Sequence, residues 1–217
     1  MPEIVALSHI FIDHSNIWGG ARLASRIRHP NVPDDNARIS VRHLDTVLGG
    51  RRLGISTKVV SGGVPPGMEG LWSEYSRHGY DTQRLFRDTQ WKERGVDHAI
   101  IGHMWRLASL HRDSPIVLIL ASGDGKRNEF RTSFLEVLDE VLRHQGRYPK
   151  WHVRLASFDW AYPDEGSFRS PTNGKMKRLV SDAPNGSFVN LMDHYDKVVY
   201  HQAPQPNTRL HPTAARS

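Results

Sequence analysis

The sequence predicts a three-layer α/β fold, in which a mostly parallel central sheet is covered by helices on both faces. Short apolar runs alternate with amphipathic segments of helical period along most of the chain. In the clearest case, an apolar run at 116–121 leads into Ser-Gly-Asp-Gly and then into an amphipathic segment, 128–144. An earlier apolar run, 9–12, also ends in an aspartate, Asp13. Because ligands of open α/β sheets bind beyond the carboxyl ends of the strands, we expect the functional site at that edge.

Length and composition predict one globular domain over residues 1–200, followed by a proline-containing, disordered tail over 201–217. The absence of cysteine excludes disulfides, thiolate zinc sites and cysteine nucleophiles. The apolar runs are too short to cross a bilayer, and the first residues do not resemble a signal peptide. We therefore expect a cytoplasmic protein that does not contact a membrane.

The formal charge of +6 and the pI of about 9.8 favour a polyanionic partner such as nucleic acid. The alternative is a basic protein that binds no anion. The basic residues form three loose clusters: Arg22, Arg26 and Arg28; Arg38, Arg42, Arg51 and Arg52; Lys126, Arg127 and Arg131. The third cluster follows Asp124, where we expect the start of a helix that could bind phosphate.

In the first half of the chain, an apolar strand over 8–13 is expected to end in an irregular, mobile loop over 19–36, opened by Trp18-Gly19-Gly20. The periodicity then predicts a helix over 37–50, capped by Asp35 or Asn36 and stopped by Gly49-Gly50. The elements expected next are a strand over 55–61, a rigid turn over 62–67, a helix over 68–77 and an edge strand over 80–87.

In the second half, apolar periodicity predicts helices over 97–111 and 128–144, with strands over 115–121 and 151–158. Residues 90–96 are expected to form a polar connection, and 161–174 a Pro/Gly/Ser-rich loop. The pattern then predicts one broken helix over 175–192 and a short last strand over 197–200.

Three acids occupy positions from which they could act together: Asp13 and Asp124 follow strands, and Asp97 begins a helix. Carboxylates without cysteine or regularly spaced histidine suit a hard cation such as Mg²⁺ or Mn²⁺. Such an ion can orient a water molecule and neutralise charge on a phosphodiester. Each acid also has a structural interpretation, since aspartate commonly caps helices and occupies turns, and an acid in a first helical turn suits the helix dipole.

Four motifs occur here in the order found in the NYN domains, a family of PIN-like nuclease folds: residues 11–16, 61–66, 92–97 and 120–125. The chain resembles that family over about residues 8–160. The resemblance implies a parallel sheet between helices and metal-dependent cleavage of RNA. It places the acids of the active site at Asp13, Asp97 and Asp124, and it implies that Asn16 positions metal or phosphate.

Two positions depart from the family pattern. Lys126 stands where many members carry another aspartate, and His103 stands where another acid is common. Asn128 and Glu129, expected in the first turn of the next helix, could substitute for the lost acids or could simply cap that helix. Fewer carboxylates would weaken Mg²⁺ binding, and the domain could then bind RNA without cutting it.

Other side chains leave alternatives open. His14, beside Asp13, could be a general base or an exposed residue. Ser15 and Ser122 lack a histidine at a recognisable spacing, which argues against a hydrolase triad. Trp18 is the best candidate to stack on a base, whereas Trp72 and Trp105 are expected in the core.

The leading hypothesis is a metal-dependent ribonuclease, an endoribonuclease acting on single-stranded RNA, that holds Mg²⁺ or Mn²⁺ through Asp13, Asp97 and Asp124. A homodimer is compatible with the sequence. The alternatives are a catalytically silent RNA-binding module of the same fold and a metal-dependent phosphatase. Further residues are assigned to RNA binding (Asn16, Ser122, Lys126, Arg127 and Asn128) or to a supplementary role (Glu93 and Glu129).

Overall fold

A computed structural model describes residues 6–49, 54–63, 69–85, 96–123, 133–159 and 174–202 of the chain. The elements follow in this order: β1 (Leu7–Asp13), α1 (His14–Arg28), η1 (Asp34–Asn36), β2 (Ala37–Ile39), α2 (Val41–Val47), β3 (Ile55–Gly63), α3 (Glu69–Arg77), β4 (Asp81–Leu85), α4 (Val96–Leu110), β5 (Ile116–Ala121), α5 (Phe134–Arg143), β6 (Trp151–Ser157), α6 (Gly174–Asp182), β7 (Gly186–Asn190), η2 (Leu191–His194), α7 (Tyr195–Val198) and β8 (Val199–His201).

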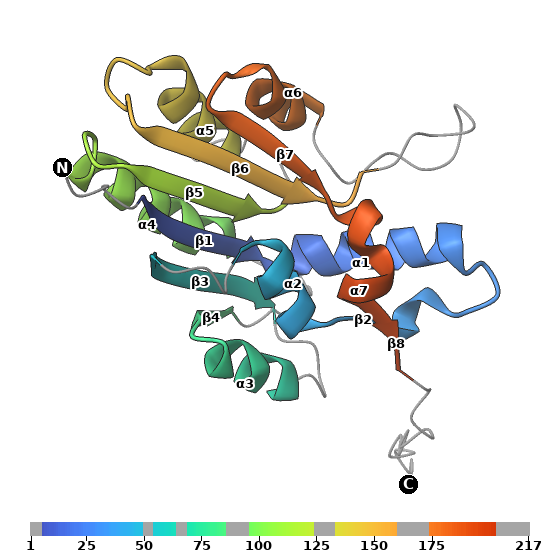
Figure 1. Cartoon of the computed structure of the whole chain (residues 1–217). Coiled ribbons are helices and arrows are strands. Elements are labelled where there is room, and N and C mark those ends of the chain that lie inside the picture. The colour runs from blue at the N-terminus through green and yellow to red at the C-terminus, as the bar shows by residue number, and fades with distance from the viewer. Residues whose placement is uncertain are drawn as a thin grey trace, which may run out of the picture.

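The central sheet has six strands in the order β4-β3-β1-β5-β6-β7, and every pairing within it is parallel. Helices flank this sheet, so the predicted three-layer α/β class is confirmed (Figure 1). The polar strand β4 lies at an edge of the sheet, as expected. A small antiparallel sheet, β2-β8, lies beside α1.

Alternation of side chains along the strands divides the core into two layers. From β1, Ile10 and Ile12 pack into one cluster with residues of α1, α2, α3 and α7. Phe11 points to the opposite face and packs with residues of α4, α5 and α6. Each fully buried side chain of this size contributes roughly 1.5–3 kcal/mol. The sheet is therefore stabilised from both sides, and its carboxyl edge is held in place by two cores.

The predicted break at residues 18–20 is wrong, and so is most of the predicted loop over 19–36. Helix α1 follows β1 directly and continues to Arg28. Asp13 caps this helix, since its Oδ1 accepts a hydrogen bond from the Asn16 backbone N–H at 3.1 Å. The helix continues through Gly19 and Gly20. A Cβ at Gly20 would lie 2.9 Å from Cδ2 of Phe158, so glycine lets α1 approach the segment after β6.

The helix expected over 37–50 is shorter and follows a strand. Ala37–Ile39 forms β2, which pairs with β8 and buries Ala37 and Ile39. The N-cap of α2 is Ser40, so the expected cap at Asp35 or Asn36 is wrong. Gly49 has a φ of 86°, which suits its expected place at the helix end.

The rigid turn expected at 62–67 is wrong at its first two residues, because β3 continues through Gly62 and Gly63. A Cβ at Gly62 would lie 3.1 Å from Trp72 and 3.2 Å from His14. The Gly63 N–H donates to Oγ of Ser15 at 3.1 Å. The glycines thus let β3 extend beneath the first turn of α1. Residues 64–67 lie outside the described residues.

Two helix predictions in the second half need correction. Helix α5 begins at Phe134 instead of residue 128, with Ser133 and Glu136 forming a capping box. Asn128 and Glu129, expected in the first turn of this helix, lie outside the described residues. The broken helix expected over 175–192 is α6, β7 and η2, because 186–190 pairs in parallel with β6.

The strands expected over 55–61, 115–121 and 151–158 and the helices expected over 68–77 and 97–111 are confirmed, with ends shifted by a few residues. The last strand, β8, follows the short helix α7. The connection at 90–95, the loop at 161–173 and the tail at 203–217 lie outside the described residues.

Candidate active site

A row of polar side chains crosses the carboxyl end of the sheet, and we call it the polar row. Asp13 of β1 pairs with Ser61 of β3, and Ser157 of β6 pairs with Asn190 of β7. Ser122, directly after β5, lies between the β1 and β6 members, since Ala121 pairs with both Ile12 and Ala156. The row therefore runs across five adjacent strands at the edge where α/β sheets bind ligands. Four of its members are buried: Ser61, Asp13, Ser122 and Ser157.

Asp13 is the charged centre of the polar row. Its side chain is only 3% exposed, and both carboxylate oxygens accept hydrogen bonds. Oδ1 accepts from the Asn16 N–H, and Oδ2 accepts from the Ser122 hydroxyl at 3.1 Å. Both donors are neutral. These two contacts orient the carboxylate, and carboxylate oxygens are ligands that Mg²⁺ and Mn²⁺ accept.

Asn16 connects α1 to the turn after β5. Its Oδ1 accepts a hydrogen bond from the Gly123 backbone N–H at 2.5 Å. Gly123 directly precedes Asp124, so this bond anchors the base of the segment that carries the second expected acid. The structure thus brings together three of the residues expected from sequence: Asp13, Asn16 and Ser122.

The oxygen donors around Asp13 fit a hard cation. A carboxylate, a side-chain amide and a hydroxyl all offer the oxygen atoms that Mg²⁺ and Mn²⁺ prefer. Among the described residues, no group of three histidine or acidic side chains could by itself hold a metal ion. A complete ligand set would therefore need the other expected acids.

The backbone of α4 places Asp97 near the carboxyl edge of the sheet, the edge at which Asp13 lies. Five residues separate the end of α4 from the start of β5, so α4 ends at the amino edge of the sheet. Its fifteen residues span about 22 Å, which returns its first turn to the carboxyl edge. Helix α4 covers the same sheet face as Phe11, the face to which Asp13 also belongs by alternation. The Asp97 side chain, and the residues Asp124, Lys126, Arg127, Asn128, Glu129 and Glu93, lie outside what the structure describes.

Sequence reasoning missed Asp159 and Asn190, which extend the site toward β7. Asn190 Oδ1 accepts hydrogen bonds from the backbone N–H groups of Asp159 and Met192, at 3.1 and 3.0 Å. Asp159 forms an ion pair with Lys177 of α6. The sequence does carry a signal for the serines of the polar row, since a small residue or valine precedes serine near three strand ends, at 60–61, 121–122 and 156–157.

His14 is not an exposed residue. Its ring is 2% exposed, forms a 3.0 Å hydrogen bond with the Tyr75 hydroxyl and packs edge-on against Trp72. Burial lowers the pKa of His14 to about 4. The imidazole therefore lies in the core between α1 and α3 and is neutral near pH 7. Trp72 lies in the same core, as expected, and Trp105 packs partly against the other core.

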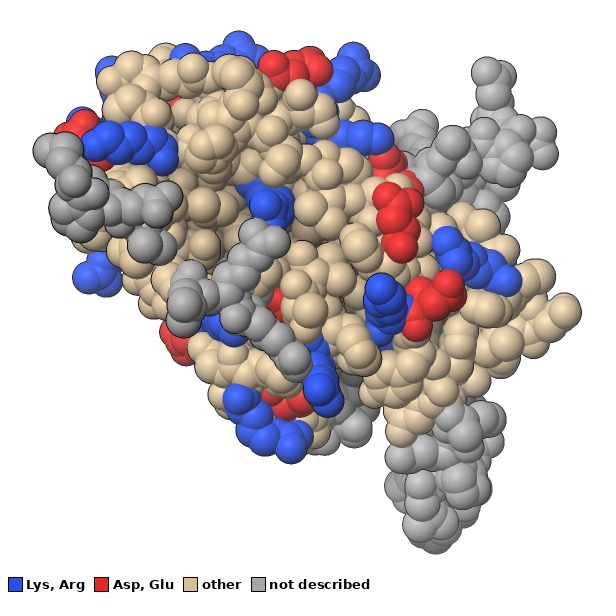
Figure 2. All heavy atoms as spheres, viewed as in Figure 1, with Lys and Arg blue, Asp and Glu red and all other residues tan. Residues whose placement is uncertain are grey.

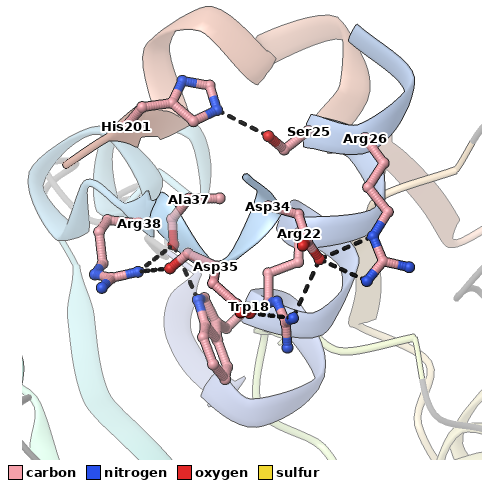
Figure 3. A network of polar contacts seen from close by, with 9 residues as sticks. All are labelled: Trp18, Arg22, Ser25, Arg26, Asp34, Asp35, Ala37, Arg38 and His201. Atoms are coloured by element: carbon pink, nitrogen blue, oxygen red, sulfur yellow. Dashed lines mark hydrogen bonds and ion pairs between the residues drawn. The ribbon is translucent and has the colours of Figure 1, made fainter. Parts of the chain in front are cut away.

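The first basic cluster is largely paired with acids (Figure 3). Arg22 and Arg26 both contact Asp34, at 3.1 and 2.9 Å, and Arg22 also pairs with Asp35. Figure 2 likewise shows basic and acidic side chains interspersed on the face that it presents. This cluster therefore offers RNA less net charge than the sequence suggests.

The environment of Trp18 argues against its expected stacking role. Its indole N–H donates to the Ala37 carbonyl at 3.1 Å, and the Arg22 guanidinium lies 5.1 Å from the ring centre. The side chain is half-buried against the core. Trp18 thus joins α1 to β2 instead of presenting an open platform for a base.

None of the helices in the described ranges combines the length and apolarity that a membrane span needs. Comparison of the sequence with protein-family models and with curated proteins gave no match.

Proposed function

We propose that this chain is a metal-dependent ribonuclease whose active site is built around Asp13. One observation carries the proposal: a buried carboxylate at the end of the central strand β1 is oriented by neutral donors from α1 and from the end of β5. Burying a carboxylate is costly without compensating hydrogen bonds, and a carboxylate is a ligand type that Mg²⁺ and Mn²⁺ prefer.

The proposed ligands of Mg²⁺ or Mn²⁺ are Asp13 and, following the family resemblance, Asp97 and Asp124. When bound, the ion would neutralise charge on the phosphodiester and activate a water molecule. Asn16 supports this arrangement from the protein side, since it fixes Gly123 and hence the start of the segment that carries Asp124. Glu93 and Glu129 are the supplementary acids in this proposal.

The proposed substrate is single-stranded RNA. The net charge of +6 favours a polyanion, but the pairing of Arg22 and Arg26 with Asp34 removes one candidate contact surface. We therefore assign phosphate binding to Lys126 and Arg127, with Ser122 and Asn128 as neutral contacts beside them. In sequence, Lys126, Arg127 and Asn128 directly follow Asp124, one of the proposed metal ligands.

The test is cleavage of a labelled single-stranded RNA in Mn²⁺, in Mg²⁺ and in EDTA, by the wild type and by Asp124→Asn. We expect cleavage that needs metal and is lost in the variant, while RNA binding persists. The control Asp139→Asn removes an exposed acid of α5 that pairs with Arg143, and it should cleave normally. Metal-independent cleavage, or full activity in Asp124→Asn, would refute the proposed site.

A silent RNA-binding module of the same fold is the second candidate. His103, at the position where an acid is expected, lines a cavity with His9, which lies four residues before Asp13 on β1. His9 and Asp13 are therefore about 13 Å apart along the strand. The middle of α4 therefore supplies a histidine beside the amino half of β1 instead of an acid. For a silent binder, RNA affinity would survive EDTA and fall steeply with salt, and no cleavage would occur in any metal.

A further inference from the structure

The cavity lined by His9 and His103 lies on the amino-terminal half of the sheet, away from the polar row. It has a volume of about 290 Å³ and is formed between β1, β3 and α4. Its floor is apolar and its polar lining consists of six residues: His9, Ser56, Thr57, His103, Arg106 and His111. The described lining thus contains one arginine, three imidazoles and two hydroxyls but no carboxylate.

His9 has a feature that ordinary core packing does not explain. Its side chain is 4% exposed, and its Nε2 has no hydrogen-bond partner among the described residues. An unpartnered buried polar atom costs roughly 1–3 kcal/mol. His9 also lines the cavity, although its Nε2 is itself buried, so the cavity borders a polar group that the described part of the fold leaves unpaired.

The other basic groups surround the cavity from α4 and the residue after it. His103 and Arg106 lie three residues apart on α4, and therefore share one face of the helix. The backbone of His111 is fixed by two hydrogen bonds: its carbonyl accepts from Trp151 Nε1 at 2.9 Å, and its N–H donates to the Leu107 carbonyl at 3.0 Å. Arg106 and these two imidazoles are thus positioned by regular structure before any ligand binds.

We infer that this cavity binds a phosphate group, either free inorganic phosphate or the terminal phosphate of a nucleic acid. Arg106 supplies a permanent charge, the imidazoles and hydroxyls supply hydrogen-bond donors, and the lining lacks a described acid that would repel an anion. A metal ion does not fit, because no described group of three histidine or acidic residues has suitable geometry. The inference does not depend on the proposed nuclease activity.

The experiment is an NMR titration of the histidine ring signals of the full chain with inorganic phosphate at constant ionic strength. We expect saturable shifts in the signals of His9, His103 and His111. Arg106→Gln should weaken phosphate binding by about tenfold, the equivalent of one charge-assisted hydrogen bond. Arg77→Gln on α3, which lies against the other core, is the matched control and should leave the affinity unchanged.

Two short RNAs of the same sequence identify the source of the phosphate. One carries a 5′-phosphate, and the other carries a 5′-hydroxyl. A short RNA with a 5′-phosphate that binds more tightly than inorganic phosphate, and shifts the same signals, would identify a nucleic-acid terminus. Equal affinity would identify the free anion. The inference is overturned if phosphate gives no saturable shift, if Arg106→Gln binds as the wild type does, or if the 5′-hydroxyl RNA produces the same shifts with the same affinity as the 5′-phosphorylated RNA.

Discussion

The Ser122 hydroxyl donates a hydrogen bond to Asp13 Oδ2 across 3.1 Å, although 109 residues separate the two in sequence. Parallel pairing of β1 with β5 brings them together, and both side chains are buried. The bond fixes the orientation of the carboxylate at the point where the two central strands end. Its strength and its role in the proposed site can be tested separately.

Replacing Ser122 by alanine should destabilise the protein by about 1–3 kcal/mol, because a buried carboxylate loses a hydrogen bond. The measurement is the free energy of unfolding in urea. Ser157→Ala is the matched control, since Ser157 is equally buried in the polar row on the next strand. If Ser157→Ala is as destabilising as Ser122→Ala, the bond to Asp13 is not the cause of the loss.

Replacing Asn16 by alanine should release the turn after β5, because the Gly123 N–H would lose its acceptor. We expect faster hydrogen exchange at the Gly123 amide and a loss of RNA cleavage that exceeds the loss of RNA binding. Asn16→Asp retains an acceptor oxygen and should preserve the protection of that amide. Unchanged Gly123 exchange in Asn16→Ala would contradict the anchoring role.

Two adjacent glycines of α1 provide a matched pair. Gly20→Ala should destabilise the fold by about 1–3 kcal/mol, because the new Cβ would lie 2.9 Å from the Phe158 ring. A Cβ at Gly19 would meet nothing described within 4 Å, so Gly19→Ala should be neutral or stabilising by up to about 1 kcal/mol. Thermal or urea unfolding of both variants is the measurement, and equal effects would show that the close packing of α1 on Phe158 is incorrect.

Much of this architecture can be predicted from the sequence, because β1 and β5 contain runs of consecutive apolar residues and β6 begins with an alternation of apolar and polar residues. Strand β7 cannot be recognised in this way, since its residues are only half-buried or exposed and form no apolar run. The length of α1 was missed because Gly19 and Gly20 suggested a break, whereas Gly20 is required for close packing on Phe158. The site was predictable in part: Asp13 and Asn16 follow the first strand, but the polar row depends on strand register, which exists only after the sheet has formed.

Burial of His14 predicts a loss of stability in acid. The pKa of His14 is lowered to about 4, against 6.5 in the unfolded chain, so the unfolded chain takes up a proton at a higher pH than the folded protein does. Stability should therefore decrease as the pH falls from about 6.5 to about 4, by about 3 kcal/mol from this residue. His9, whose pKa is also lowered to about 4 by burial and by nearby His111, should contribute in the same direction.

The measurement is the free energy of unfolding in urea at pH 7, 5.5 and 4. His14→Gln removes one titrating group from this core and should reduce the loss of stability between pH 6.5 and 4. His152→Gln, which replaces an exposed histidine of β6, is the control, and it should leave the loss of stability between pH 6.5 and 4 in place. A pH profile that is identical in His14→Gln and the wild type would contradict the burial of a neutral imidazole.

The central claim, that Asp13 is the core of a metal-dependent ribonuclease site, is tested most directly by RNA cleavage with Asp13→Asn at saturating Mn²⁺. Asparagine keeps the size of the side chain and an oxygen that can accept from Ser122, and circular dichroism verifies that the variant is folded. The account predicts a loss of cleavage of at least about a hundredfold with RNA binding retained, since the charge that would hold the cation is gone. Cleavage at the wild-type rate by folded Asp13→Asn would contradict it.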